Sequence, residues 1–89
     1  MNNGKSWNWR IVEFNEKARE YHTQAYHSLD PYVRYAGHCR ARGCSLPAEV
    51  YVVYNYVTGR QGRVSEARKV MCRRCAEAAV AKHAAPAKV

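Results

Sequence analysis

Four cysteines in two close pairs constrain this chain more than any other feature of its sequence. Cys39 and Cys44 form a CxxxxC pair, Cys72 and Cys75 form a CxxC pair, and 27 residues separate the two pairs. Two close pairs joined by a longer arm let four thiolates converge on one tetrahedral Zn²⁺ at about 2.3 Å each. Because the protein then fills all four positions, the spacing predicts one structural zinc ion with no open site for catalysis.

Other uses of the four cysteines stay open at this point. Four soft thiolates also suit an iron–sulfur centre, and cysteine pairs also serve redox or disulfide roles. A thioredoxin-like redox role lacks the βαβ pattern that accompanies it. His38 and His83 flank the cysteines and are alternative ligands, although four thiolates already satisfy the metal.

The small size of the chain explains why its core needs additional stabilisation, such as a bound metal ion. A domain of 89 residues buries only about 60–65% of its unfolded surface, so we expect a single domain, 1–89, with a modest core. The N-terminus has no apolar run behind Lys5, and no apolar stretch is long enough for a membrane span. We therefore expect a cytoplasmic protein without membrane contact, in which thiols stay reduced and disulfides are rare.

The segments around the cysteines predict a β-hairpin followed by a helix. Residues 49–57 are dense in β-branched and aromatic side chains, and after a glycine-punctuated turn residues 64–71 pair back as a second strand. The alanine-rich residues 73–85 are predicted to form a helix that Pro86 ends. Gly43, directly before the second cysteine, supplies the positive φ that a tight metal knuckle requires.

This order resembles the treble-clef zinc finger over residues 39–85: a knuckle with two ligands, a hairpin, and a helix whose first turn carries the last two ligands. The resemblance implies a zinc-finger module at residues 38–85. The first pair of the family is usually CxxC, whereas this chain has CxxxxC, so a rubredoxin-like or other zinc-ribbon arrangement stays an alternative. Treble clefs bind DNA, RNA or proteins, and some are nucleases, so the resemblance does not settle the function.

The N-terminal part, residues 1–37, is predicted to be helical. Apolar residues recur at helical spacing, which predicts one amphipathic helix over residues 6–29 with Ser6 as its N-cap. The residues of this stripe are Trp7, Ile11, Phe14, Ala18, Tyr21, Ala25 and Leu29. Trp7, Trp9 and Ile11 also alternate as in a strand, but Val12 breaks that period.

A second, shorter helix is predicted directly before the knuckle. Asp30 is a suitable N-cap and Pro31 suits the first helical position, so we expect a helix over residues 31–36 that ends at Gly37. The whole chain is therefore expected to be a small α+β fold, with residues 86–89 as a disordered tail.

The positive charge lies almost entirely on the cysteine-bearing part. The chain carries a net charge of +8. Residues 1–37 have five basic and four acidic side chains, whereas residues 38–89 have ten basic and three acidic ones. Such an excess favours a polyanionic partner. The candidate nucleic-acid-binding residues are Arg40, Arg42, Arg60, Arg63, Arg68, Lys69, Arg73 and Arg74.

Within that set, the arginines beside the cysteines and those on the predicted turn have different explanations. Arg40, Arg73 and Arg74 neighbour ligands and can offset the thiolate charge. Arg60 and Arg63 lie on a glycine-flanked turn, where their guanidinium forks are free to reach phosphates.

Two functions follow from these patterns. The first is a small regulatory zinc-finger protein that binds nucleic acid, with DNA favoured over RNA as the expected ligand. The alternative is an adaptor that docks on a larger acidic protein through Trp7, Ile11 and Phe14, and the patterns leave open whether the chain is a monomer or a homodimer. We expect no enzyme, because residues 45–71 lack the histidine that HNH-type treble-clef nucleases use as a general base.

Overall fold

The computed structural model of the chain describes residues 6–84, which form one three-stranded antiparallel sheet and three helices. The α+β class expected from the sequence is therefore confirmed. The strands are β1 (Ser6–Glu13), β2 (Val50–Thr58) and β3 (Arg63–Met71), with β2 in the centre, and the helices are α1 (Glu16–Tyr26), α2 (Pro31–Ala36) and α3 (Arg73–Ala84). None of these helices combines the length and apolarity that crossing a membrane requires.

The hairpin and the two helices that flank the cysteines occur at the expected positions. β2 pairs with β3 along its whole length, from Val50 opposite Met71 to Thr58 opposite Arg63. The Asp30 side chain accepts a hydrogen bond from the backbone N–H of Tyr32 and so caps α2. The expected end of α3 at residue 85 and the expected disordered tail at residues 86–89 both lie outside the described residues.

The expected long helix over residues 6–29 is wrong. Residues 6–13 form β1, which pairs antiparallel with β2, and the helix begins only at Glu16, capped by the Asn15 side chain rather than by Ser6. β2 is rich in valine and tyrosine and has two edges to pair, so it recruits a second partner strand from far along the chain. N-terminal residues 1–37 are thus not wholly helical, and β1 shares one sheet with the hairpin.

A bulge in β1 explains why its strand pattern is hard to recognise. The register shifts between Trp7 and Arg10, and Asn8 within this bulge has a φ of 61°. Such a bulge moves the following side chains to the opposite face of the sheet. Trp7 therefore lies opposite Asn55, on one face, whereas Ile11 lies opposite Val52, on the other.

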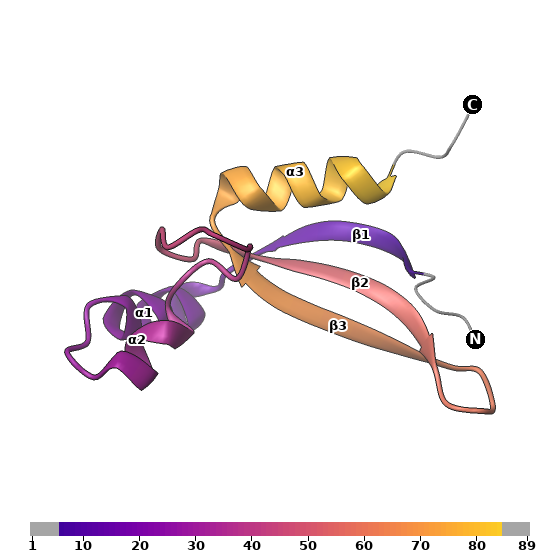
Figure 1. Ribbon diagram of the computed structural model, residues 1–89, viewed down its shortest axis with the longest axis horizontal. Helices are drawn as coiled ribbons and strands as arrows, with labels where there is room; N and C mark the ends of the chain where they lie inside the picture. Colours follow the sequence, from indigo (N-terminus) through magenta and orange to yellow (C-terminus); the bar gives the residue numbers. More distant parts are fainter. Residues whose placement is uncertain (1–5, 85–89) are drawn as a thin grey trace.

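The core lies between α3 and one face of the sheet. Figure 1 shows α3 running over this face, which carries Val50 and Val52 at 0% exposure. Ala76 of α3, also at 0%, packs against them together with Met71, and the buried Cys39 and Cys72 belong to the same cluster. The predicted metal ligands are therefore part of the hydrophobic core and not an appendage to it.

The helical pair α1–α2 lies at one end of the sheet, away from the hairpin tip (Figure 1). Phe14, just before α1, is buried against the rings of His22 and Tyr51 and joins this pair to β2. The other members of the expected helical stripe do not share one buried face, because Tyr21 is 58% exposed and Leu29 is 95% exposed.

Candidate functional site

The four cysteines converge at the junction of the loop after α2, the end of β3 and the start of α3. Their Sγ atoms all lie within 4.8 Å of one another. Cys44 Sγ and Cys72 Sγ are 3.9 Å apart, close to the roughly 3.8 Å that separates two thiolates on one tetrahedral zinc with bonds of about 2.3 Å. The same distance is far beyond a disulfide bond of about 2.05 Å, and all four thiols are free. The cluster is therefore compatible with a metal ion held by four sulfur ligands.

The first two cysteines are positioned by a tight knuckle that extends from residue 38 to residue 47. The backbone N–H of Cys39 donates to Leu46 O at 2.9 Å, and that of Cys44 donates to Ala41 O at 3.1 Å. Gly43 has the expected positive φ, at 78°. The Ala41 N–H also points at Cys39 Sγ, at 3.5 Å. These bonds close the four intervening residues into a compact turn, which explains how the wide CxxxxC spacing still brings two sulfur atoms together.

The last two cysteines are positioned by the transition from β3 to α3. Cys72 directly follows the strand, and Cys75 lies one turn on, in the first turn of the helix. The Glu49 carboxylate accepts a hydrogen bond from the Arg73 backbone N–H at 2.6 Å, which satisfies one of the free donors at this helix start. The Glu49 N–H in turn donates to Met71 O at 2.8 Å. The start of the hairpin and the start of α3 are thus tied together beside the sulfur cluster.

Joint ionisation of the four clustered thiols requires a nearby positive charge. Hydrogen bonding to Cys72, together with burial, raises the pKa of Cys75 to about 12, and burial raises the pKa of Cys39 above its ordinary value. The Leu46 backbone N–H stabilises the Cys44 thiolate and lowers the pKa of Cys44. Four adjacent thiols cannot all ionise without a counter-charge, and a divalent metal supplies that charge as it displaces the thiol protons. The donor set therefore fits a metal such as zinc.

The two histidines considered as alternative ligands have other contacts. His83 stacks on Trp9 with ring centroids 3.8 Å apart, and Trp9 stacks on Tyr54 on its other side at 4.0 Å. His38 lies against the ring of Tyr26 at 5.1 Å. These contacts hold α3 on β1 and hold the knuckle on α1, which are structural roles.

No protein-family model matches the chain, and neither the curated proteins nor the solved structures contain a significant match. The class of the molecule therefore follows from its geometry alone. It is a small α+β protein in which a cluster of four cysteines, compatible with a metal ion, joins a knuckle, a hairpin and a helix.

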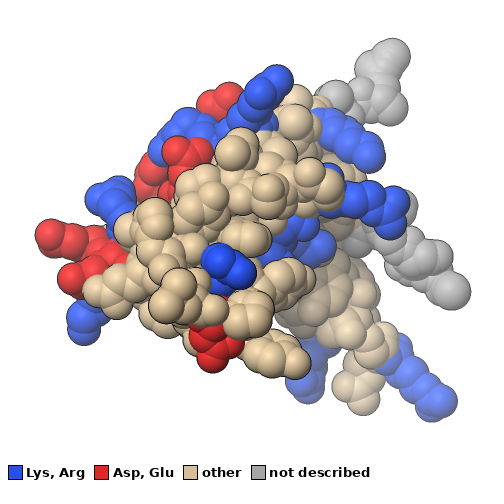
Figure 2. Space-filling view, turned by 60° about the vertical axis from the view of Figure 1, so that its left-hand side comes forward, with Lys and Arg blue, Asp and Glu red and all other residues tan. Residues whose placement is uncertain are grey.

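The predicted basic residues do not gather on one surface. Figure 2 shows acidic and basic side chains interspersed on its left-hand side, whereas on the right-hand side basic side chains stand without acidic neighbours. Arg42 and Arg74 are exposed, and Arg40 lies with its guanidinium 4.7 Å from the ring centre of Tyr35. Lys69 lies 5.9 Å from the ring centre of Tyr54.

Arg73 is engaged in a structural ion pair. Its guanidinium binds both oxygens of the Glu13 carboxylate, at 2.8 and 2.9 Å. This contact lowers the pKa of Glu13 and raises that of Arg73. The pair ties the end of β1 to the start of α3, so Arg73 has a role in holding the fold beside the cysteines.

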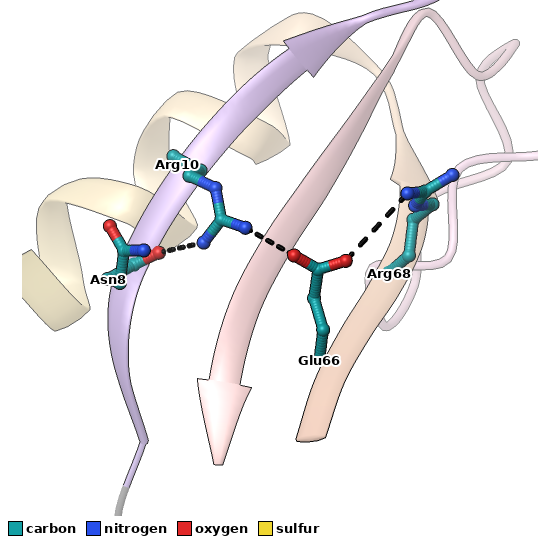
Figure 3. A network of polar contacts seen from close by, with 4 residues as sticks. All are labelled: Asn8, Arg10, Glu66 and Arg68. Atoms are coloured by element: carbon teal, nitrogen blue, oxygen red, sulfur yellow. Dashed lines mark hydrogen bonds and ion pairs between the residues drawn. The ribbon is translucent and has the colours of Figure 1, made fainter. Parts of the chain in front are cut away.

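Arg68 takes part in a network across the sheet face that α3 leaves open. Arg10 of β1 reaches over β2 to the Glu66 carboxylate at 2.6 Å, while Arg68 approaches the other oxygen of the same carboxylate at 3.9 Å (Figure 3). Arg10 also donates to the backbone oxygen of Asn8 at 2.7 Å. One carboxylate is thus shared by two arginines, which leaves this face with a surplus of positive charge.

The two arginines of the hairpin turn lie at the far end of the sheet from α1 and α2 (Figure 1). Arg60 and Arg63 line a shallow recess of about 420 Å³ together with Thr58, Gly59 and Gln61, and both are exposed. The recess contains no carboxylate among its lining residues. Their position agrees with the expectation that these side chains are free to meet an external ligand.

The fold separates the three residues that were predicted to form an alternative docking surface. Phe14 is 4% exposed and Ile11 packs partly buried against the core, whereas Trp7 is 42% exposed on the other face of the sheet. The helical stripe that was expected to present them together does not form. Docking of a partner on these residues stays a prediction.

Sequence reasoning missed several surface residues that the fold brings together. Arg10 joins the open sheet face only because β1 is a strand, and Tyr21 and Tyr35 line one recess with Arg68 only because α1, α2 and β3 meet. These contacts join residues far apart in the chain, and no local pattern signals them.

Proposed function

We propose that this chain is a zinc-finger protein of the treble-clef type that binds nucleic acid through its basic hairpin and sheet. The order of elements supports the finger: the knuckle with Cys39 and Cys44, the β2–β3 hairpin, and α3 with Cys75 in its first turn. The sulfur-only donor set, with its Sγ atoms within 4.8 Å of one another, supports zinc as a structural ion. The proposed role is binding and not catalysis.

The observation that carries the nucleic-acid proposal is the arginine pair at the hairpin tip. Arg60 and Arg63 project from a glycine turn whose recess holds no acidic side chain. Guanidinium forks bind phosphate oxygens in pairs of hydrogen bonds, which suits them to a nucleic-acid backbone. The metal cluster braces the other end of the same hairpin, so the tip is presented on a rigid support.

Metal analysis of the purified full chain tests the finger. We expect one zinc per chain, lost in Cys72→Ser, while Ser45→Ala in the same region keeps it. Iron in place of zinc contradicts the assignment of the metal, and a chain without stoichiometric metal contradicts the finger altogether.

A gel-shift series over salt concentration tests nucleic-acid binding with duplex DNA, single-stranded DNA and RNA. Because each phosphate contact contributes about 0.9 to the slope of log affinity against log salt, Arg60→Ala with Arg63→Ala is expected to reduce that slope by about two. The matched control replaces Lys17 and Arg34, two exposed basic residues of the helical pair, and leaves the slope unchanged. No binding of any of the three ligands at low salt contradicts the proposal.

The alternative function, docking on a protein partner, is supported by a different set of residues from the one expected. Trp7, Val57 and Val64 are 42%, 42% and 60% exposed, and the strand register puts them on the sheet face that α3 leaves open. Stoichiometric capture of an acidic protein after nuclease treatment, lost in Trp7→Ala, favours this alternative. Loss of all captured material on nuclease treatment contradicts it.

A further inference from the structure

A second recess lies on the opposite end of the sheet from the hairpin tip, where α1, α2 and the knuckle meet the edge of β3. It encloses about 590 Å³, within the range of about 300–1,000 Å³ typical of small-ligand sites. The residues that give it its chemistry are Tyr21, His22, Tyr35, Arg40, Arg68 and Val70. We call it the tyrosine–arginine hollow.

The lining of the tyrosine–arginine hollow is strongly cationic. Its lining residues, all within the described part of the chain, include three cationic side chains and no carboxylate. The Lys69 ammonium group lies near the Tyr54 ring, on the face of the sheet that α3 covers. The positive charges available to a ligand in the hollow are therefore two guanidinium groups, those of Arg40 and Arg68.

The charge of Arg68 is largely uncompensated by its one acidic neighbour. The Glu66 oxygen lies 3.9 Å from Arg68, whereas the other oxygen of that carboxylate lies 2.6 Å from Arg10 (Figure 3). Glu66 therefore pairs mainly with Arg10, because ion-pair energy falls with distance and with exposure to water. Arg68 thus retains hydrogen-bonding capacity for an external anion.

Flat surfaces accompany the two cations. The Arg40 guanidinium lies 4.7 Å from the ring centre of Tyr35, and that of Arg68 lies 5.0 Å from the ring centre of Tyr51. Tyr21 and Tyr35 both line the hollow, and each residue is 58% exposed. Tyrosine rings and guanidinium planes are the two kinds of surface on which an unpaired nucleobase stacks.

Two walls of the hollow are held by contacts of their own. The Arg40 backbone N–H donates to Val70 O at 2.9 Å, which fixes the knuckle to β3 directly beside Cys39. His22 is held by a stack on Phe14 at 4.6 Å and by a contact of its Nδ1 with Ala18 O at 2.8 Å. Because the knuckle and His22 are already held in place, they lose less entropy when a ligand binds.

We propose that the tyrosine–arginine hollow is a subsite for one unpaired nucleotide of a single-stranded nucleic acid, with its base on Tyr35 and Tyr21 and its phosphate on Arg40 and Arg68. A cationic hollow with exposed rings matches a ligand that joins a planar ring to a phosphate. Bases within a duplex stay stacked on their neighbours and cannot enter, so the hollow favours single strands. This inference rests on the proposed nucleic-acid binding and adds a strand preference and a location to it.

Fluorescence anisotropy tests the proposal with three labelled probes: a thymidine oligonucleotide, a uridine oligonucleotide and a DNA duplex of equal length. The variants are Tyr35→Ala and Arg68→Gln in the full, metal-loaded chain. The matched controls are Tyr32→Ala and Arg34→Gln, because both residues are exposed on α2 and neither lines the hollow. Far-UV circular dichroism confirms that each variant is folded.

We expect each hollow variant to weaken binding of the single-stranded probes about tenfold, as loss of one base stack or one charged phosphate contact does. Tyr35→Ala should leave duplex binding within twofold, whereas Arg68→Gln should weaken duplex binding less than it weakens single-strand binding, because Arg68 also belongs to the basic surface of the sheet. The controls should change neither. Equal losses for single strands and duplex, or no loss in either variant, overturn the hollow while the proposed nucleic-acid function stands. If the unmodified chain binds none of the probes, the proposed function fails and the hollow fails with it.

Discussion

Replacing Gly37 by alanine should force the end of α2 away from α1. Gly37 ends α2 with a φ of −94°, a conformation that alanine adopts without strain. The difficulty is space: a Cβ at this position lies 2.6 Å from the backbone oxygen of His22, 2.8 Å from Cα of Tyr26, and closer still to the Tyr26 backbone nitrogen. These are backbone atoms of α1, so no side-chain rotation relieves the contact.

The size of the effect follows from these distances. Ordinary contacts of a Cβ begin at 3.4 Å, so α1 and α2 must move apart by about 1 Å for the variant to fold. Forcing an extra methyl group into a packed site costs about 1–3 kcal/mol, and contact with backbone on three atoms puts this variant at the upper end, about 3 kcal/mol. In a domain of this size 1 kcal/mol shifts the melting temperature by about 4–8 °C, so a decrease of about 12–24 °C is expected.

The assay is thermal and urea denaturation followed by far-UV circular dichroism, with Gly59→Ala as the matched control. Gly59 has a φ of 81° and open space around the new methyl group, so its substitution carries only backbone strain, about 1–2 kcal/mol. If Gly37→Ala is as stable as Gly59→Ala or more so, the close approach of α1 and α2 does not limit the size of the side chain at position 37.

Three further predictions concern the sheet, α3 and the metal. Glu13→Gln should lower the melting temperature at neutral pH, because Arg73 depresses the folded-state pKa of Glu13 below its ordinary 4.5. The stabilisation from the pair is present above that value and is lost as the pH falls through the folded-state pKa, so the two melting curves should converge in acid; a difference that persists there contradicts the pairing. His83→Ala should cost about 1 kcal/mol in urea denaturation by removing one ring from the stack on Trp9, and unchanged stability and tryptophan emission would count against the stack. Chelation should abolish cooperative unfolding of the hairpin and α3, whereas a cooperative melt after complete metal removal argues against a structural ion.

The parts of the fold that local sequence predicts well are those with local chemical signals. Asp30 and Pro31 start α2 because one caps the helix and the other needs no hydrogen-bond partner there. Residues 50–58 are so rich in β-branched and aromatic side chains that a strand is their best conformation. Gly43 takes the positive φ that the knuckle requires. Each of these features depends on residues a few positions apart.

The N-terminal strand shows where local reasoning fails. The spacing of Trp7, Ile11 and Phe14 fits a helix, and the bulge at Asn8 hides the alternation of a strand. The deciding interaction is the hydrogen-bonded edge of β2, more than 35 residues further along the chain. Periodicity measures which side chains share a face, and it cannot measure which backbone edge is available for pairing.

The candidate metal centre and the tyrosine–arginine hollow differ in the same way. The cysteine spacing predicts that four sulfur atoms can meet, and they lie within 4.8 Å of one another. The hollow draws Tyr21 from α1, Tyr35 from α2 and Arg68 from β3, and none of these residues is unusual in its own segment. Only the placement of the three elements around one recess brings their charged and ring-bearing side chains together.

The cysteine cluster, the hairpin with its arginine tip and the helix that follows can all be predicted from local sequence, because ligand spacing, side-chain branching and capping act over short distances in the chain. Three features arise only when the chain folds: residues 6–13 complete the sheet, Glu13 binds Arg73, and Arg40 and Arg68 face a common recess. Those outcomes depend on which distant surfaces can bury apolar area and satisfy backbone hydrogen bonds together, and that choice is made by the folded chain as a whole.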